Sequence, residues 1–289
     1  MIQRVARQID EAGLNANITI AANETQLELI RSQLPGDVKV VYEPARRDTF
    51  PAIALACAHL ALEQGCGEDE VVVVMPCDPY TGNGYFQTLK RMAEAVEQNA
   101  ARLVLMGIQP TYPSSKYGYI VPDGGSASVR KVLRFTEKPS VEKAEELLSQ
   151  GALWNGGVFA FKLGYMMELT RSFIDSNRFS FILSHYEDFP KISFDYQVAE
   201  KETSVAVVPY DGEWKDLGTW NTLTDELSFS TTGRTLTGPE CKNVHIINEL
   251  NLPVFADGLE DVVIAVSEDG ILVCRRDRTE FLKEYVDKL

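Results

Sequence analysis

The sequence predicts an α/β fold built on a doubly wound, mostly parallel sheet. Short apolar runs alternate with helical patterns through the first hundred residues, and this spacing is typical of successive βαβ units. Two of the runs, 71–75 and 103–108, are apolar on both faces, as are strands covered by helices on each side. Beyond about residue 227, short strand patterns replace the alternation. We therefore expect one large domain over 1–227 and a small β-rich unit over 228–289.

Local signals place the elements in order. Asn23 to Gln26 forms a capping box for a helix that runs to about residue 34, and Pro51 stands in the first turn of a helix that runs to about residue 64. The segment 228–238 is rich in Ser, Thr and Gly, which is typical of a linker. Periodicity predicts the other elements: strands over 18–22, 38–42, 71–75, 103–108, 117–121, 129–135, 157–161, 244–248, 262–266 and 271–274, and helices over 85–99, over 141–150 and from about 277.

Charge and composition exclude two classes of protein. The chain carries 28 Lys and Arg against 42 Asp and Glu, a formal charge of −14, whereas a protein that grips a nucleic acid polymer needs a basic face. No apolar run approaches the ~20 residues that cross a bilayer, and the first residues contain no apolar signal core. The five cysteines form no CxxC pair, which suits a reducing compartment. We expect a cytoplasmic protein with no nucleic acid or membrane partner.

Two carboxylates stand where a sheet of this kind binds ligands. Asp78 follows the apolar run 71–75, and Asp216 ends a short strand before a helix, while ligands of open α/β sheets lie at the carboxyl ends of strands. The structural alternative for each is an ordinary cap of a turn or helix. Brought together, the two side chains would suit Mg²⁺, which takes one or two carboxylates and completes its octahedron with phosphate oxygens and water.

Three further segments carry groups that suit a phosphorylated sugar or a nucleotide. Lys138, held between a strand and Pro139, offers a point charge to a phosphate, with Glu137 as an acceptor for hydroxyl groups; the alternative is an exposed charge pair. In Asn155-Gly156-Gly157 the glycines permit close backbone approach, although a tight strand-entry turn needs the same residues. The charged loop 43–49 precedes a helix, where an anion or base would bind, or it is a solvated loop.

In this order, these segments resemble the mannose-1-phosphate guanylyltransferases, also called GDP-mannose pyrophosphorylases, of the sugar nucleotidyltransferase superfamily. The resemblance runs from the first residue to about residue 227 and continues more loosely beyond it. Two of the runs are more similar to enzymes of mannose 1-phosphate than to relatives that transfer to glucose or transfer thymidylyl groups: PKISFDYQVAEK (190–201) and RDT-x-PAIALA (47–56). The other matching stretches are VVVVMPCDPY (71–80), YGYIVP (117–122), FTEKPS (135–140), LWNGGVFAFK (153–162) and WKDLGTW (214–220).

The resemblance implies a Rossmann-like nucleotide-diphospho-sugar transferase fold and a GTP-binding enzyme. It implies transfer of GMP from GTP to mannose 1-phosphate, which releases pyrophosphate and supplies GDP-mannose for polysaccharide biosynthesis. Such transfer depends on positioning and charge neutralisation. Mg²⁺ is the implied cofactor, and a homodimer is an open option.

The resemblance also implies a role for each candidate residue. Asp78 and Asp216 would hold Mg²⁺, and Lys138 would contact the sugar phosphate; these three form the implied catalytic set. The implied sugar-binding residues are Gly118, Glu137, Lys138, Asn155 and Gly156, and the implied nucleotide-binding residues are Glu43, Arg47, Asp48 and Thr49.

One motif of the family is missing from these 289 residues. Relatives begin with a strand and a glycine-rich loop of the form GGxGTRLxP, whereas Met1 to Arg4 resembles the helix after that loop. Three explanations stay open: a truncated chain, which we favour because the other motifs look intact, a degenerate homologue, or one half of a split protein. The alternatives to the enzyme are therefore a non-catalytic regulatory protein that binds a sugar phosphate or nucleotide, or a nucleotidyltransferase for another sugar 1-phosphate.

Overall fold

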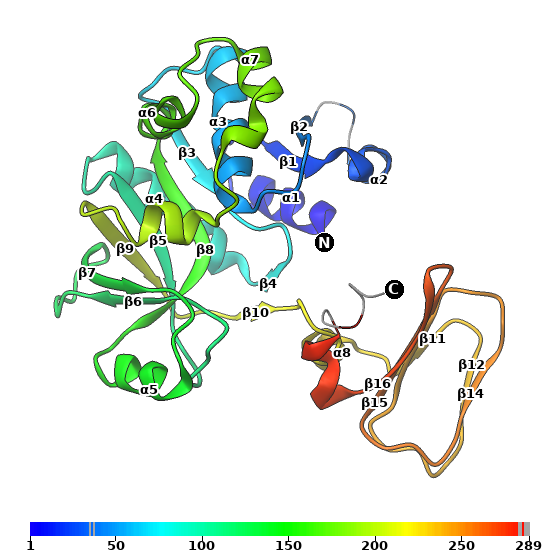
Figure 1. Cartoon of the computed structure of the whole chain (residues 1–289). Helices are drawn as coiled ribbons and strands as arrows, with labels where there is room; N and C mark the ends of the chain where they lie inside the picture. Colours follow the sequence, from blue (N-terminus) through cyan, green and yellow to red (C-terminus); the bar gives the residue numbers. More distant parts are fainter. Residues whose placement is uncertain (35, 37, 283–284, 286–289) are drawn as a thin grey trace. The chain divides into compact units, whose positions relative to one another are not determined.

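The computed structural model describes residues 1–34, 36, 38–282 and 285 (Figure 1). The chain forms two compact units. The first unit comprises Met1–Cys77 and Thr81–Trp214, and the second comprises Asp78–Tyr80 and Lys215–Leu289. The division expected at residues 227 and 228 stays a prediction about the functional domains.

A six-stranded sheet forms the centre of the first unit. Strand β5 lies parallel to β9 and antiparallel to β8, and β8 pairs with β3 on its other side and with β6 near its start. The order across the sheet is β3 (Val71–Val74), β8 (Leu153–Lys162), β5 (Leu103–Ile108), β9 (Val205–Tyr210), β7 (Arg130–Thr136) and β6 (Tyr119–Pro122).

The expected α/β architecture is present, but this sheet is mixed rather than mostly parallel. The pairings make β3, β5, β9 and β6 run in one direction and β8 and β7 in the other. Strand β3, expected to be buried and parallel, is half-buried and pairs with antiparallel β8. An apolar run carries no information about the direction of the neighbouring strand, so the sequence could not predict that β3 pairs with an antiparallel strand.

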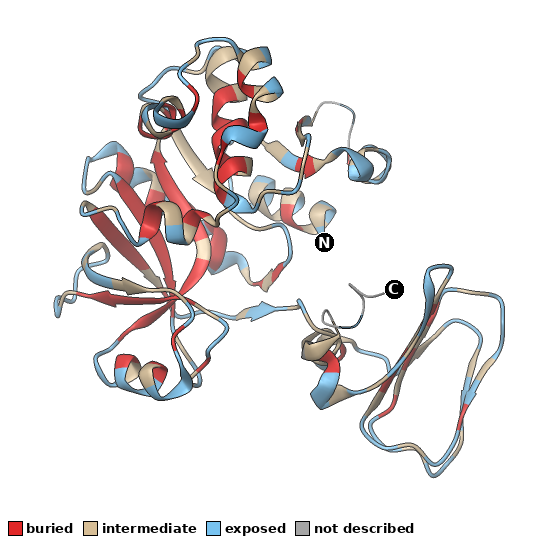
Figure 2. Cartoon of the chain, viewed as in Figure 1, coloured by how far each residue is buried: buried red, intermediate tan, exposed pale blue. Residues whose placement is uncertain are grey.

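Helices cover both faces of the sheet. The buried residues of the first unit lie mainly on the strands and on the helices that cover them (Figure 2). A separate parallel pair, β1 with β2, precedes the helix that packs against both β2 and the sheet. One face carries α3 (Thr49–Leu62), α6 (Leu163–Phe173), α7 (Phe179–Ser184), η2 (Tyr186–Asp188) and η3 (Asp195–Ala199), and the other carries α1 (Ile2–Glu11), α4 (Asn83–Glu97) and α5 (Val141–Ser149). The remaining elements of the first unit are β1 (Thr19–Asn23), η1 (Glu24–Gln26), α2 (Leu27–Gln33) and β2 (Lys39–Glu43). The predicted capping box at Asn23 and Gln26 is confirmed.

The second unit is a short coil of strands. Parallel pairings stack β11 on β13 and β13 on β15, and β16 closes the stack as an antiparallel hairpin with β15. A second wall is formed by the parallel pair β12 and β14. The bounds are α8 (Trp220–Glu226), β11 (Thr231–Thr232), β12 (Thr235–Thr237), β13 (His245–Asn248), β14 (Val254–Ala256), β15 (Val262–Ser267), β16 (Gly270–Arg275) and η4 (Arg276–Phe281).

The linker expected over 228–238 is therefore wrong, because β11 and β12 lie within it. Both strands pair with the next turn of the coil, where β-branched threonines fit a pleated surface. Gly233 turns the chain between them at φ +79°, and a Cβ there would lie 2.0 Å from the carbonyl oxygen of Asn248. Ser, Thr and Gly thus build the tight corners of a coil here. In the described part of the chain, no helix is long and apolar enough to span a membrane.

Candidate active site

Glu137 and Lys138 lie at the end of β7 in a constrained backbone. Lys138 has a φ of +45°, a left-handed conformation that is uncommon for a residue with a side chain. Its Nζ donates to Oε1 of Glu137 at 2.8 Å, and the Glu137 side chain is only 5% exposed while that of Lys138 is 55% exposed. Oε2 of Glu137 is buried without a hydrogen-bond partner among the described residues. A buried carboxylate oxygen in that state costs stability and suits a donor brought by a ligand.

Gly118 leaves the space that this carboxylate occupies. A Cβ at position 118 would lie 2.3 Å from Oε2 of Glu137, so any larger residue would displace the carboxylate. The carbonyl oxygen of Gly118 accepts from the backbone N–H of Asn155 at 2.8 Å. With Lys138, the structure thus brings together four of the residues expected to line a sugar pocket. Gly156 is placed instead against Ile108, whose Cγ1 would lie 3.0 Å from an added Cβ.

Asp195, to which the sequence reasoning gave no role, fixes the amide of Asn155. Nδ2 of Asn155 donates to Oδ1 of Asp195 at 2.6 Å, and Oδ1 of Asn155 accepts from the backbone N–H of Gly157 at 3.2 Å. Asp195 begins η3, a π-helical turn, and such turns are frequent at functional sites. Further along the same segment, Glu200 accepts from the backbone N–H of Glu137 at 3.2 Å. The only sequence signal for a role of Asp195 was the presence of an acidic residue inside the run SFDYQVAEK.

Burial and mutual repulsion shift the ionisation of this cluster. Burial raises the pKa of Glu137, which Asp195 and Glu200 raise further, against the opposing effect of Lys138. Burial also raises the pKa of Asp195, helped by Asp48 and opposed by Asn155 and Lys138. For Lys138, burial works to lower the pKa, but the carboxylates of Glu137 and Asp195 outweigh it and raise the pKa. The cluster therefore keeps a firmly charged ammonium beside carboxylates that bear their charge at a cost.

The 43–49 loop is anchored to the segment that leads into Asp195. The guanidinium of Arg47 donates to the carbonyl oxygen of Phe189 at 2.9 and 3.0 Å, and Glu43 accepts from the hydroxyl of Tyr186 at 2.8 Å. Oγ1 of Thr49 accepts from the backbone N–H of Phe194 at 2.8 Å. These contacts give Glu43, Arg47 and Thr49 structural partners.

Asp48, in contrast, holds an unusual backbone conformation in the same loop. Its φ is +72° and its ψ is −177°, a region occupied almost only by glycine. Its side chain accepts from the backbone N–H of Thr49 at 2.8 Å and so caps α3. Strain of this kind persists where the surroundings enforce it, and it is concentrated at functional sites. The loop lies near Asp195, because Thr49 accepts from the backbone N–H of Phe194 and the charge of Asp48 helps to raise the pKa of Asp195.

Asp78 and Asp216 both fall in the second unit. Asp78 precedes β4 (Pro79–Thr81), Asp216 ends β10 (Trp214–Asp216), and these two strands pair. Oδ1 of Asp216 accepts from the backbone N–H of Gly218 at 2.8 Å, while Thr219 caps α8, so Asp216 forms a turn and is not the helix cap. Both carboxylates are exposed. Within the described residues no group of three or more His, Cys, Asp or Glu is poised to hold a metal.

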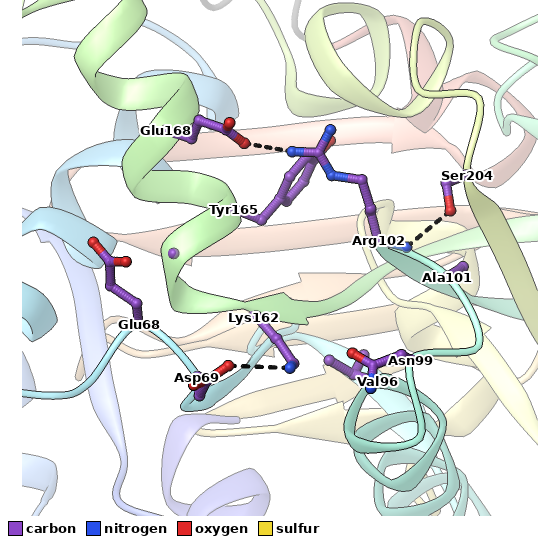
Figure 3. A pocket seen from close by; sticks show the side chains of 11 residues that line it. Glu68, Asp69, Val96, Asn99, Ala101, Arg102, Lys162, Tyr165, Glu168 and Ser204 are labelled. Carbon is purple, nitrogen blue, oxygen red and sulfur yellow. Dashed lines mark hydrogen bonds and ion pairs between the residues drawn. The ribbon is translucent and has the colours of Figure 1, made fainter.

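A hollow of about 380 Å³ lies at the end of the six-stranded sheet where β3, β5 and β9 begin (Figure 3). Its charged side chains already have partners: Lys162 pairs with Asp69 at 3.1 Å, and Arg102 pairs with Glu168 (Figure 3). Arg102 also stacks over the ring of Tyr165 at 4.7 Å. Because ligands of such sheets bind at the opposite ends of the strands, where Asn155 pairs with Gly107 of β5, this hollow is a weaker candidate.

Comparison with known proteins places this geometry in a family. A family profile described as nucleotidyl transferase matches residues 1–233. The chain belongs to this family. The predicted fold of nucleotide-diphospho-sugar transferases is thereby confirmed, since a crystal structure from Thermus thermophilus, described as a mannose-1-phosphate geranyltransferase, superposes with a TM-score of 0.73 at 31% identity. That superposition covers 93% of this chain and 83% of the other.

Curated relatives are about one third identical to the chain over the aligned residues. A mannose-1-phosphate guanylyltransferase of Escherichia coli is 32% identical over 301 residues, which cover 93% of this chain and 63% of the relative. The xanthan biosynthesis protein XanB of Xanthomonas campestris pv. campestris (strain B100) is 31% identical over 272 residues, which cover 86% of this chain and 57% of XanB. The chain thus spans less than two thirds of the length of these relatives. The predicted resemblance to mannose-1-phosphate guanylyltransferases is confirmed.

Proposed function

We propose that the chain acts in the transfer of GMP from GTP to mannose 1-phosphate, which yields GDP-mannose for polysaccharide biosynthesis. The observation that carries this proposal is the buried, unpartnered Oε2 of Glu137 beneath Gly118 and beside the exposed ammonium of Lys138. An acceptor for hydroxyl groups next to a cation for phosphate matches the two ends of a sugar 1-phosphate. Relatives named mannose-1-phosphate guanylyltransferase support the choice of sugar and nucleotide.

In the proposed reaction, a phosphate oxygen of the sugar attacks the α-phosphorus of GTP. A new P–O bond forms, the bond to the bridging α,β oxygen breaks, and pyrophosphate leaves with that electron pair. Lys138 neutralises the sugar phosphate, Glu137 binds sugar hydroxyls, and the Asn155 amide, held by Asp195, keeps a donor for the sugar. We place the guanine nucleotide near the loop of Glu43, Arg47, Asp48 and Thr49, whose conformation is fixed by its own contacts.

Nucleotidyl transferases use a divalent metal, and we propose Mg²⁺ at Asp78 and Asp216. The donor set fits, because Asp78 directly precedes β4, Asp216 ends its partner strand β10, and both carboxylates are exposed. Mg²⁺ takes few protein ligands beside phosphate and water. When bound, the metal would neutralise phosphate charge. The cytoplasmic location stays a prediction.

Calorimetry with mannose 1-phosphate tests the sugar site. We expect Gly118→Ala to weaken binding by at least about tenfold, because the new methyl group displaces the Glu137 carboxylate and removes a charge-assisted hydrogen bond. The matched control is Gly124→Ala, since a Cβ at Gly124 meets nothing within 4 Å. Equal affinity of the two variants would overturn the sugar site.

A pyrophosphate-release assay with GTP and mannose 1-phosphate then separates an enzyme from a binding protein. Release that depends on both substrates supports the proposed reaction. Binding of both substrates with no release would favour the non-catalytic regulatory homologue instead. Glucose 1-phosphate in parallel reports the choice of sugar.

A further inference from the structure

A second hollow of the first unit, of about 310 Å³, lies beside the loop that joins β6 to β7. Its lining comprises residues 125–128 of this loop, Arg130 at the start of β7, Arg91 of α4 and Pro209 of β9. None of these residues belongs to the candidate active site, so the hollow needs an explanation of its own.

Strand pairing explains why the loop leaves the sheet at this point. Arg130 of β7 lies opposite Val207 of β9 in an antiparallel register, and continuing that register would set Ser128 opposite Pro209. Proline has no N–H to donate to a neighbouring strand, and the pairing of β7 with β9 ends at Arg130. The chain before Arg130 therefore departs from β9 and leaves a space beside Pro209.

The loop carries hydrogen-bond donors that the protein itself does not use. The backbone N–H groups of residues 125–128 and the hydroxyls of Ser126 and Ser128 have no acceptor among the described residues. These residues are exposed, so the donors are accessible to a ligand. A loop with several unused donors beside a hollow suits a ligand that brings acceptors only.

Two guanidinium groups line the hollow without an acidic counterpart. Arg91 donates to the hydroxyl of Thr88 at 2.6 Å, which is a neutral partner, and neither Arg91 nor Arg130 forms an ion pair within the described part of the chain. The described lining contains no carboxylate. Asp123 lies against the loop, where its buried Oδ1 would be 3.5 Å from a Cβ at Gly125, and it leaves the two positive charges in excess. Electrostatics therefore favour an anion here.

The hollow where β3, β5 and β9 begin shows the opposite arrangement. There Lys162 pairs with Asp69 and Arg102 pairs with Glu168, so its cations are already neutralised by the chain. Arginines without an ion pair thus distinguish the hollow beside the β6–β7 loop, in a chain whose formal charge is −14.

We propose that this hollow binds the phosphate group of a small phosphorylated metabolite, at a site separate from the candidate active site. Guanidinium groups pair bidentately with phosphate oxygens, and the loop supplies further donors. A volume of about 310 Å³ lies near the lower limit of ligand pockets, ~300 Å³, which suits a phosphomonoester of the size of a sugar phosphate.

Strand β7 separates the proposed phosphate site from the candidate sugar site. Arg130 begins this strand and Glu137 follows its last residue, and an extended chain rises ~3.3 Å per residue, so the two residues lie about 23 Å apart. One small ligand cannot contact both sites. The phosphate site therefore stands or falls independently of the proposed transfer reaction.

Protection from phenylglyoxal, which modifies accessible guanidinium groups, locates the site in the full chain. We expect orthophosphate, pyrophosphate and glucose 6-phosphate, each tested alone, to be compared by peptide mass spectrometry, and the preferred one to slow modification of both Arg91 and Arg130 by at least about fivefold. The probe that protects at the lowest concentration distinguishes an inorganic from a sugar-borne phosphate. Arg134, which lies on β7 and donates to the neutral Gln150, is the control. Failure of every probe to protect both arginines, or equal protection of Arg134, would overturn the proposal.

Equilibrium dialysis with orthophosphate measures the affinity. The Lys138→Gln background removes the contribution of the candidate sugar site, so that failure of one site is distinguishable from failure of the other. In that background, Arg130→Gln should weaken binding by at least about tenfold, because it removes a charge-assisted bidentate pair. Arg134→Gln makes the same change of charge on the same strand and should alter the affinity by less than about twofold. Equal effects of the two variants would show general attraction to positive charge and would overturn the site.

Discussion

The first unit encloses its apolar side chains between helices and a sheet, whereas the second leaves many of them in solvent. Both faces of the six-stranded sheet are covered, and residues such as Leu105 and Ile120 are fully buried. Among the described residues of the second unit, the apolar cluster inside the coil has five buried members, while Phe255 and Ile271 are 64% and 72% exposed. The second unit therefore has less buried apolar surface to stabilise it than the first.

Polar groups show the opposite difference. In the first unit the candidate sugar site is buried and strained, with an unpartnered oxygen on Glu137 and positive φ angles at Asp48 and Lys138. In the second unit Asp78 and Asp216 are exposed, so water satisfies them. We therefore expect that substitutions which remove the buried charge of the first unit weaken ligand binding but raise the free energy of unfolding. Substitutions of the exposed carboxylates in the second unit should change activity with little effect on the free energy of unfolding.

The largest expected effect is a loss of activity that leaves the melting temperature almost unchanged. Asp78→Asn or Asp216→Asn should reduce metal-dependent pyrophosphate release by at least about 1,000-fold, because each removes a proposed ligand of the cation. The melting temperature should stay within about 2 °C, since exposed substitutions have small effects. The exposed carboxylate variant Asp211→Asn is the control. Near-normal activity in both variants would remove the metal from this unit.

The next effect is on the free energy of unfolding, compared between one isoleucine in each unit. Ile120→Ala in β6 should lower the free energy of unfolding by about 3 kcal/mol, because it leaves a cavity in a core where Ile120 is fully buried. Ile271→Ala should cost less than about 0.5 kcal/mol at concentrations where the chain is monomeric. Urea denaturation measures both. A comparable loss at Ile271 under those conditions would mean that β16 is covered within the single chain.

Much of the first unit could be predicted because its local and tertiary signals agree. The run 103–108 is apolar on both faces and becomes the fully buried β5, and the capping box at Asn23 begins η1 where expected. The direction of β8 could not be predicted, since it depends on which strands lie beside it. The strands within 228–238 were missed because Ser, Thr and Gly suit both a linker and the corners of a coil.

The candidate site was predictable only in part. Glu137, Lys138, Gly118 and Asn155 come together as their motifs suggested. Asp195 was missed because its role arises from a contact with Asn155 forty residues away in the sequence, which no local pattern encodes. The partners of Arg47 and Glu43 are likewise about 140 residues distant, so a loop that could be read as solvated is held in place.

The smallest expected effect is a gain in the free energy of unfolding of the first unit that is accompanied by weaker ligand binding. Glu137→Gln should raise the free energy of unfolding by about 1 kcal/mol at pH 8, because it removes a buried charge with an unpartnered oxygen, while it weakens binding of mannose 1-phosphate. Burial raises the pKa of Glu137, so the unmodified chain gains stability as the pH falls and this carboxyl group takes up a proton. The advantage of the variant should therefore shrink from pH 8 toward pH 4, as followed by urea denaturation at each pH. An advantage independent of pH would show that the Glu137 charge is not what limits stability at this site.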